Sequence, residues 1–401
     1  MDIGAVQVAL REREIDGWLL YDFHGSNPIA RRLVGVAGEG MTTRRWFYFV
    51  PQSGAPQGLV HAIEPQALSD APGERIVYTS WRDLELGLQR LLQGRQRVAM
   101  EYSPGGAIPY VSRVDAGTIE LVRRSGVEVV SSANLIQVFE ARWSTRQKAL
   151  HDQAARLVLA TKDDAFGLVA RQLRAGVPVK ESELQAFVSE GLEKRGLTFD
   201  HPCIVAVNDH AANPHFEPEA GADDRVIRSG DLLLLDVWAK VESEVDAVYY
   251  DTTWMAFCGG SLPPRIAEVW RVVAGARDAA VECLRQAHEK GTHLRGCDVD
   301  DAARGYIEAR GFGPYFLHRT GHSIGTEVHG NGANIDNLET RDERELISGT
   351  GFSIEPGVYL PELGVRSEID VFMSEAGPEV TGAIQNAPEL LVTEKSLPTE
   401  K

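Results

Sequence analysis

Residues 231–239 read DLLLLDVWA, an apolar run of strand-like composition that has one carboxylate, Asp236, inside it. A carboxylate taken out of water is costly unless a cation or hydrogen-bond donors compensate its charge. Considered alone, Asp236 is most simply a residue near a strand end that points to solvent. The same oddity recurs, however, at Asp251 in VYYDTTWMAF and at Glu355, which ends an apolar run in GFSIEPGVYL. One solvated acid is ordinary, but the repetition needs an explanation.

A fourth acid-containing run is GVRSEIDVFM, where the two-residue period of a strand puts Arg366, Glu368 and Asp370 on one face. A face of alternating charges is most often solvated. The stretch HRTGHSIGTEVHG (318–330) adds three histidines to the same part of the chain. Together these runs favour an oxygen-rich metal site with one imidazole ligand. Such hard ligands favour manganese, cobalt or iron, and zinc stays open.

The composition is that of a soluble globular protein. The chain has 401 residues, 43% of them hydrophobic and 25% charged, which is comfortable for two domains. A net charge of −17 argues against a nucleic-acid-binding surface. The first residues do not resemble a secretory signal, and no apolar run reaches membrane-spanning length. Four scattered cysteines suggest reduced thiols, so we expect a cytoplasmic protein without a membrane or nucleic-acid partner.

The first part of the chain alternates between helix-like and strand-like runs. VQVALREREIDGWLLYD predicts a helix leading into a strand, RRWFYFVP and QRVAMEY predict further strands, and DLELGLQRLLQG predicts a helix ended by Gly94. This pattern indicates an α/β domain. We expect it to cover residues 1–143, with a second domain over 144–401.

The second part predicts helices separated from an antiparallel sheet, an α+β arrangement. Ser144 and Gln147 form a capping box before a long amphipathic run that Gly176 ends, and Ser182 with Gln185 predicts a second box. The runs RIAEVWRVVAGARDAAVECLRQAHEKG and VDDAARGYIEARG predict two more helices. CIVAVN and the four acid-containing runs are strand-like.

These motifs, taken together and in this order, resemble the pita-bread metallopeptidases, which include methionine aminopeptidase, aminopeptidase P and prolidase. The resemblance is closest to prolidase (Xaa-Pro dipeptidase) and covers roughly residues 144–395. The front part resembles the smaller creatinase/prolidase-type N-terminal domain. The resemblance therefore implies a C-terminal pita-bread catalytic domain preceded by a smaller α/β domain.

The resemblance also implies a set of metal ligands. Two divalent ions are expected, Mn²⁺ in the first place, with Co²⁺ or Zn²⁺ as alternatives. The positions that match the ligands of the family are Asp236, Asp251, His322, Glu355 and Glu368.

Further positions match residues that contact substrate in the family. His215 and His329 are expected to stabilise the reaction intermediate, and Glu355 to move a proton as well as to bind metal. His318 is expected to contact the proline ring. Arg366 and Arg341 are candidates for binding the substrate carboxylate, and Arg366 is alternatively expected to orient Glu368.

The sequence departs from the family pattern around the two aspartates. Asp236 and Asp251 are fifteen positions apart, more than is usual, and we expect the extra residues to lengthen the hairpin around KVESEVDA. Ala247 and Val248 replace a common Gly-Tyr pair, and Trp254 replaces an arginine. These changes leave the ligands in place but put substrate contacts near the hairpin in doubt.

The activity implied by the resemblance is metal-dependent hydrolysis of Xaa-Pro dipeptides by a homodimer, with a small peptide that has proline in second position as substrate. Aminopeptidase P, which acts on longer peptides, is the main alternative. A metal-free amidinohydrolase of the creatinase type and a non-catalytic peptide-binding module are more remote, because such proteins lack the full ligand set.

Overall fold

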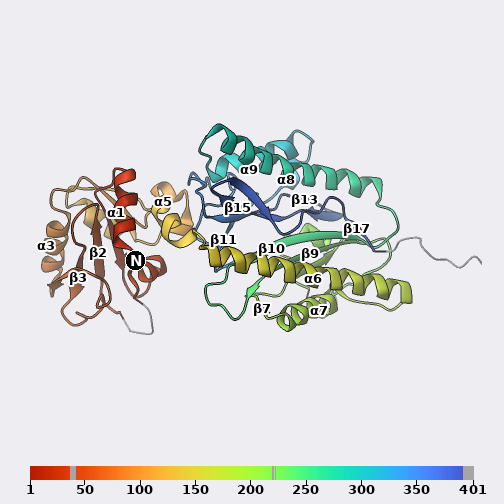
Figure 1. Cartoon of the computed structure of the whole chain (residues 1–401), viewed down its shortest axis with the longest axis horizontal. Helices are drawn as coiled ribbons and strands as arrows, with labels where there is room; N and C mark the ends of the chain where they lie inside the picture. The colour runs from red at the N-terminus through yellow and green to blue at the C-terminus, as the bar shows by residue number, and fades with distance from the viewer. Residues whose placement is uncertain (37–41, 219–220, 222, 392–401) are drawn as a thin grey trace, which may run out of the picture. The chain divides into compact units, whose positions relative to one another are not determined.

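The computed structural model describes residues 1–36, 42–218, 221 and 223–391. Contacts divide the chain into two compact units, Met1–Glu140 and Ala141–Lys401 (Figure 1). Among the described residues, no helix is both long enough and apolar enough to cross a membrane.

The first unit is built on one six-stranded sheet in the order β4-β3-β2-β1-β5-β6. Only β2 runs antiparallel to its neighbours, and the other pairs are parallel. Its strands are β1 (Gly17–Asp22), β2 (Trp46–Pro51), β3 (Gln57–His61), β4 (Glu74–Tyr78), β5 (Arg97–Met100) and β6 (Glu128–Ser131). Its helices are α1 (Ile3–Glu12), α2 (Pro28–Val34), α3 (Trp81–Leu92), α4 (Ala116–Arg123) and α5 (Ala133–Ile136).

Both faces of this sheet are buried, as an α/β layer requires. Trp18 and Leu20 of β1 belong to one apolar cluster, whereas Leu19 and Tyr21 belong to another. The expected helix end at Gly94 is confirmed, because α3 stops at Leu92 and Gly94 has a φ of 75°. The α/β character predicted for this part of the chain is therefore confirmed.

In its described residues the second unit contains three sheets. The first has the order β17-β10-β9-β7, with β8 also paired to β9, and consists of β7 (Leu197–Thr198), β8 (Ile204–Val207), β9 (Leu232–Val241), β10 (Tyr250–Phe257) and β17 (Glu389–Leu390). The second consists of β11 (Ser323–Ile324), β12 (Gly351–Ile354), β15 (Ile369–Ser374) and β16 (Gly377–Thr381). The third pairs β13 (Gly357–Leu360) with β14 (Leu363–Arg366). All pairs are antiparallel except β10 with β17.

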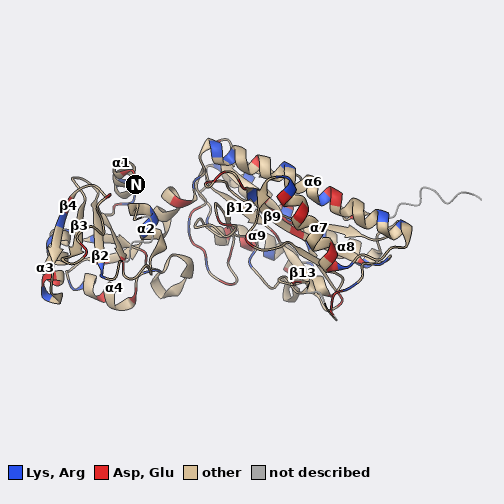
Figure 2. Ribbon diagram, turned by 90° about the horizontal axis from the view of Figure 1, so that it is seen from below, with Lys and Arg blue, Asp and Glu red and all other residues tan. Residues whose placement is uncertain are grey.

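Four long helices surround these sheets: α6 (Thr145–Ala175), α7 (Glu181–Lys194), α8 (Pro264–Lys290) and α9 (Gly296–Glu308). Short helical turns lie at η1 (Pro104–Gly106), η2 (Pro109–Val111), η3 (Gln137–Ala141), η4 (His210–Ala212) and η5 (Gly313–Tyr315). Acidic and basic residues are interspersed along the outer face of α6 (Figure 2).

The helix starts test two sequence predictions. The box at Ser144 and Gln147 is confirmed, since each residue's side chain accepts the backbone N–H of the other. The predicted box at Ser182 is wrong. Helix α7 begins at Glu181, where the Glu183 carboxylate accepts the backbone N–H of Lys180. The Ser182 hydroxyl instead donates to the Asp224 carboxylate at 2.7 Å, which removes it from capping.

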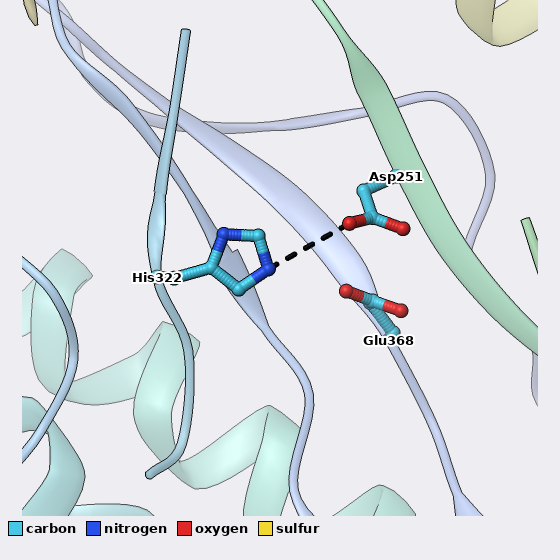
Figure 3. Close-up of side chains that lie close together, drawn as sticks. All are labelled: Asp251, His322 and Glu368. Carbon is cyan, nitrogen blue, oxygen red and sulfur yellow. Dashed lines mark ion pairs between the residues drawn. The ribbon is translucent and has the colours of Figure 1, made fainter. Parts of the chain in front are cut away.

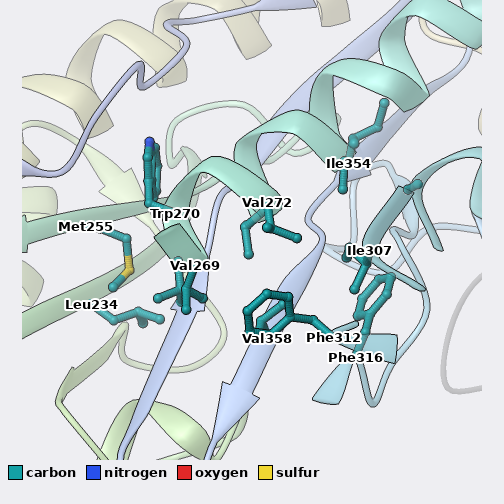
Figure 4. Packing of buried hydrophobic residues seen from close by; sticks show 14 of the residues in the cluster. Leu234, Met255, Val269, Trp270, Val272, Ile307, Phe312, Phe316, Ile354 and Val358 are labelled. Atoms are coloured by element: carbon teal, nitrogen blue, oxygen red, sulfur yellow. The ribbon is translucent and has the colours of Figure 1, made fainter. Parts of the chain in front are cut away.

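Strand β9 divides the core of this unit between two helix layers. Leu232 and Leu234 pack in a cluster with α8 and α9, part of which Figure 4 draws, whereas Leu233 and Leu235 pack with α6 and α7. Because side chains alternate along a strand, Asp236 belongs to the first of these faces. The carboxylate thus continues an apolar row that leads from the core to a cavity.

Candidate metal centre

The β9–β10 hairpin aligns the first two expected ligands. In its register Asp236 lies opposite Thr253, and Trp238 lies opposite Asp251. The two aspartates are therefore two residues apart across the ladder and share one sheet face. The residues between Val241 and Tyr250 lie outside both strands, so most of the stretch KVESEVDA forms the loop of this hairpin.

A break shared by two strand pairs positions the two glutamates. The predicted single strand over residues 365–373 is wrong, because β14 ends at Arg366 and β15 begins at Ile369. The segment paired with it is interrupted at the same level, between β12 and β13, where Pro356 has no N–H to donate to a ladder. Glu355 and Glu368 lie at these two breaks and so leave the ladders. The Glu368 side chain contacts the sheet that carries the aspartates, because its Oε2 accepts a hydrogen bond from the Thr253 hydroxyl at 2.8 Å.

The backbone of His322, the expected imidazole ligand, is held by Ser353. His322 immediately precedes β11, its carbonyl accepts the Ser353 N–H at 2.8 Å, and its own N–H donates to the Ser353 hydroxyl at 2.9 Å. Gly321, the residue before it, lies so close to Ser353 that a Cβ atom would be 1.9 Å from the Ser353 carbonyl oxygen. The glycine in the motif TGH is therefore required by packing.

These elements bring ligand atoms together. His322 Nε2 lies 3.6 Å from Asp251 Oδ2 and 3.5 Å from Glu355 Oε1. Ligand atoms of Asp251, His322 and Glu368 all lie within 4.8 Å of one another, and Figure 3 shows these three side chains converging on one point. At most 8% of the surface of Asp236, Asp251, His322 or Glu368 is exposed.

The donor set fits divalent cations. Asp236 Oδ1 and Asp251 Oδ1 are buried and have no hydrogen-bond partner in the described part of the chain. Burial, and then the neighbouring acids, raise the pKa of Asp251 and of Glu368 well above the ordinary range. Burial lowers the pKa of His322 well below its usual value, which keeps the imidazole neutral as a metal ligand must be. Bound cations would relieve both the repulsion and the unpaired oxygens.

The acids open into a cavity of about 770 Å³. His215, His318, His329 and Arg366, all singled out from the sequence, line this cavity. All five expected ligands line it as well: Asp236, Asp251, His322, Glu355 and Glu368.

The three additional histidines differ in their surroundings. His318 is held on both sides, with Nδ1 2.6 Å from the Arg319 carbonyl oxygen and Nε2 2.6 Å from the Tyr359 hydroxyl. The His329 ring stands perpendicular to that of His322, with centroids 4.3 Å apart, and burial lowers its pKa to about 4. His215 is exposed on the segment that follows η4.

Arg366 is only 3% exposed and contacts the carboxylates of the site. Its guanidinium pairs with Asp236, and its Nε donates to the Thr253 hydroxyl at 2.9 Å. That hydroxyl in turn donates to Glu368 Oε2 at 2.8 Å. Of the two functions expected for Arg366, orienting Glu368 is thus supported by a chain of hydrogen bonds through Thr253.

Arg341 does not line the cavity, contrary to the expectation from sequence. Its exposed guanidinium lies 3.1 Å from the Glu343 carboxylate. The physical reason is a tight turn around Asp336, whose carboxylate accepts the backbone N–H groups of Leu338, Glu339 and Thr340. Other lining residues were missed from the sequence: Asp200, His201, Trp238, Arg319 and Glu339. Arg319 carried a signal, its place beside His318 in HRTGH, whereas Asp200 and His201 carried none.

Comparison with known proteins decides the family. The model of metallopeptidase family M24 matches residues 150–375, more than half of the chain. The chain belongs to metallopeptidase family M24. Its second unit has the pita-bread fold expected from the sequence, preceded by a smaller N-terminal unit, and the metallopeptidase assignment is confirmed.

Two relatives with similar sequences come from Bacillus subtilis. The uncharacterized peptidase YqhT is 31% identical over 270 residues, which span 66% of this chain and 69% of that protein. The putative dipeptidase YkvY is 27% identical over 254 residues, 63% of each chain.

Solved structures share the fold over nearly the whole chain. A dipeptidase from Pyrococcus horikoshii covers 97% of this chain and all of its own, with a TM-score of 0.61 and 24% identity. The match to dipeptidase PepE from Mycobacterium ulcerans covers 97% of this chain and 96% of that protein, with a TM-score of 0.65 and 23% sequence identity. A third match is an X-prolyl aminopeptidase from Caenorhabditis elegans, described as a cytosolic enzyme with a di-nuclear active site. It covers 95% of this chain and 61% of that protein, with a TM-score of 0.62 and 17% sequence identity.

Proposed function

We propose that this M24 protein is a dinuclear-metal-dependent Xaa-Pro dipeptidase. The observation that carries the proposal is the convergence of five ligand-type side chains and three further histidines on one cavity. Oxygen-rich ligands favour Mn²⁺, with Co²⁺ or Zn²⁺ as alternatives. We further propose a cytoplasmic homodimer.

Asp236, Asp251, His322, Glu355 and Glu368 would hold the two ions. Divalent ions bound there would act as Lewis acids and lower the pKa of a bound water molecule. The negative charge of four carboxylates matches two such ions.

Glu355 is suited to move a proton. Its carboxylate lines the cavity, with Oε1 3.5 Å from His322 Nε2, and an ionised carboxylate there can accept and return a proton. It would take a proton from the attacking water and deliver it to the leaving nitrogen of the peptide bond.

His329 and His215 are suited to donate hydrogen bonds to the carbonyl oxygen of the substrate as negative charge develops on it. With a pKa of about 4, His329 is a neutral imidazole at pH 7 and donates through one ring N–H. His318 and Tyr359, linked to each other, would form the wall against which the proline ring packs. A proline nitrogen carries no N–H, so recognition must rest on ring shape.

An Xaa-Pro aminopeptidase is the second candidate, favoured by the size of the cavity, since 770 Å³ exceeds the volume of a dipeptide. A non-catalytic peptide-binding module is a remote third candidate. Such a module would purify without metal and would not respond to manganese.

The test is a hydrolysis panel of Xaa-Pro and Xaa-Ala dipeptides and Xaa-Pro-Yaa tripeptides, run on chelator-treated protein with Mn²⁺, Co²⁺ or Zn²⁺ added back. The Asp251→Asn variant serves as a control for contaminating peptidases. We expect metal-dependent hydrolysis, fastest for Xaa-Pro dipeptides. Faster cleavage of tripeptides would identify an aminopeptidase P instead, and equal rates for Xaa-Ala would remove the proline preference.

A further inference from the structure

Another cavity belongs entirely to the first unit. Its volume of about 640 Å³ lies within the range of roughly 300–1,000 Å³ that is usual for small-molecule sites. The strands β1, β3 and β4 run in the same direction and all end at this cavity, and residues just before the antiparallel strand β2 complete its wall. In open α/β sheets, ligands bind outside the carboxyl ends of the parallel strands. The cavity therefore has the position of a ligand site.

The side chains that line this cavity are mainly basic. Four of them can carry positive charge: His24, Arg44, Arg45 and His61. Asp115 is the one acid among the described lining residues, and it is engaged at the start of α4. Its carboxylate accepts the backbone N–H of Thr118 at 2.9 Å and the Thr118 hydroxyl at 2.7 Å. The arginine charges are thus left for another anion.

Arg45 is held at the wall of this cavity. The Tyr78 hydroxyl donates to the Arg45 carbonyl oxygen at 2.8 Å, which fixes the main chain there. Burial raises the pKa of Tyr21 and of Tyr78, and the charge of Arg45 opposes this rise in both, so its guanidinium acts on both hydroxyl groups.

Neither arginine of this cavity has an acidic partner. The half-buried Arg45 and the exposed Arg44 form no ion pair within the described residues. The Arg44 guanidinium donates to the Thr43 hydroxyl at 2.9 Å, which is a neutral group. Removing part of the water from a charged group is unfavourable unless an opposite charge compensates it. A bound anion would supply that charge.

Two aromatic rings are exposed at the same cavity. Phe23 is 42% exposed and Trp81 is 57% exposed. The loop that carries Phe23 is held by Asp22, whose carboxylate accepts two backbone N–H groups of that loop. Exposed rings provide faces on which the flat ring of a ligand can stack, whatever its exact substituents. The cavity thus combines unpaired cations with stacking surfaces.

We propose that this cavity binds a nucleoside monophosphate, with the phosphate on Arg44 and Arg45 and the base against Trp81 and Phe23. A guanidinium pairs with two phosphate oxygens through parallel N–H···O bonds. A phosphate monoester carries a charge of about −1.5 to −2 at pH 7, so it matches two guanidinium groups better than a single carboxylate does. The site is independent of the proposed peptidase function, because it shares no lining residue with the cavity of the metal centre.

Isothermal titration calorimetry of the metal-loaded full chain with AMP, adenosine and inorganic phosphate tests the proposal. AMP should bind at one site per chain, and adenosine and phosphate each at least about tenfold more weakly, because each lacks one of the two recognised groups. Arg45→Ala should raise the Kd for AMP about ten- to a hundredfold, and Arg45→Lys less, because lysine keeps the charge without the paired bonds. Trp81→Ala should raise it about fivefold or more.

Arg90→Ala is the matched control, since Arg90 is an exposed arginine on α3 that does not line the cavity. Its Kd for AMP should equal that of wild type. Peptide hydrolysis without nucleotide should be the same in wild type and in all of these variants.

Several outcomes would overturn the proposal. Wild type that does not bind AMP, or Arg45→Ala that binds it as tightly as wild type, would exclude the site. AMP binding that is lost on metal removal but kept in Arg45→Ala would place the nucleotide at the metal centre. Phosphate that binds as tightly as AMP would contradict recognition of the base. Slower peptide hydrolysis by Arg45→Ala without nucleotide would mean that the cavity serves the peptidase reaction.

Discussion

Asp251 illustrates, at the scale of one residue, how this protein holds charge in an apolar setting. Its backbone N–H donates to Asp370 at 2.9 Å, one carboxylate oxygen approaches His322, and the other has no partner among the described residues. Without a cation such a carboxylate is destabilising when ionised. Its environment therefore favours a bound cation.

We predict that Asp251→Asn loses at least one metal ion and lowers turnover at least about a hundredfold, because a neutral amide cannot balance cation charge. Metal analysis and peptide hydrolysis on the same preparation check this. Glu362→Gln, which changes an exposed acid in the turn between β13 and β14, is the control and should behave as wild type. Full metal occupancy in Asp251→Asn would exclude the residue as a ligand.

Glu355 gives a prediction on pH and stability. Its pKa in the folded protein, about 7, lies above its ordinary value of 4.5, so its contribution to stability is present below pH 4.5 and is lost as the pH rises through 7. In metal-free protein, Glu355→Gln should equal wild type near pH 4.5 and exceed it by about 2–4 kcal/mol at pH 8. Urea unfolding of chelator-treated protein measures the difference. A constant difference across this range would contradict the raised pKa.

His329→Ala should lower kcat about a hundredfold and change KM little, because the contact we propose strengthens only as charge develops on the substrate. Steady-state kinetics give both constants. Metal content must be measured too, since the His329 ring packs against the ligand His322. An unchanged kcat with a raised KM would make His329 a ground-state binding residue.

At this scale the sequence predicted more of the metal centre than of the substrate pocket. Asp236 and Asp251 can be recognised in the sequence, because a carboxylate inside an apolar strand is unusual. The sequence suggested that Arg341 contacts the substrate, but Arg341 lies outside the cavity. The direction of its loop depends on the turn around Asp336, which cannot be read from residue spacing. Asp200 reaches the cavity wall only through tertiary folding, and no local pattern marks it.

Helix α6 packs against the sheet whose strands β9 and β10 carry Asp236 and Asp251. Its start is defined by the reciprocal bonds of Ser144 and Gln147. We predict that Ser144→Ala lowers the free energy of unfolding by about 1 kcal/mol and leaves kcat unchanged. Urea unfolding measures this. Gln147→Ala, alone and combined, tests the coupling: fully additive losses would mean that the two caps act independently.

Element boundaries were harder to predict than element types. Ser182 had the right residue for a cap, but Asp224, distant in sequence, captures its hydroxyl. The run over residues 365–373 shows no sign of its break in the sequence. Ser367 and Ile369, at the break, are buried in the same way as strand residues. The break depends on Pro356 in the partner strand, so the strand's own sequence could not reveal it.

On the scale of the whole molecule, the two units have separate apolar clusters, and the candidate metal centre belongs to the second. We predict that Mn²⁺ stabilises only that unit, by about 2.7 kcal/mol at a hundredfold excess over Kd. Hydrogen-exchange mass spectrometry should show added protection in peptides from residues 141–391 and none in residues 1–36. Asp251→Asn should show no gain. Equal protection of both units would mean that they unfold as one.

The loop between β9 and β10 separates Asp236 and Asp251 by fifteen positions in the sequence, although the two residues lie close together in the sheet. The ladder fixes the register from Leu232 opposite Phe257 to Ala239 opposite Tyr250, and the residues between Ala239 and Tyr250 take no part in the pairing of β9 with β10. Residues gained or lost in that loop therefore leave the two aspartates facing the same point. The number of residues between the two aspartates therefore does not by itself set the distance between their carboxylates. A motif search that fixes the number of residues between the aspartates would miss such proteins.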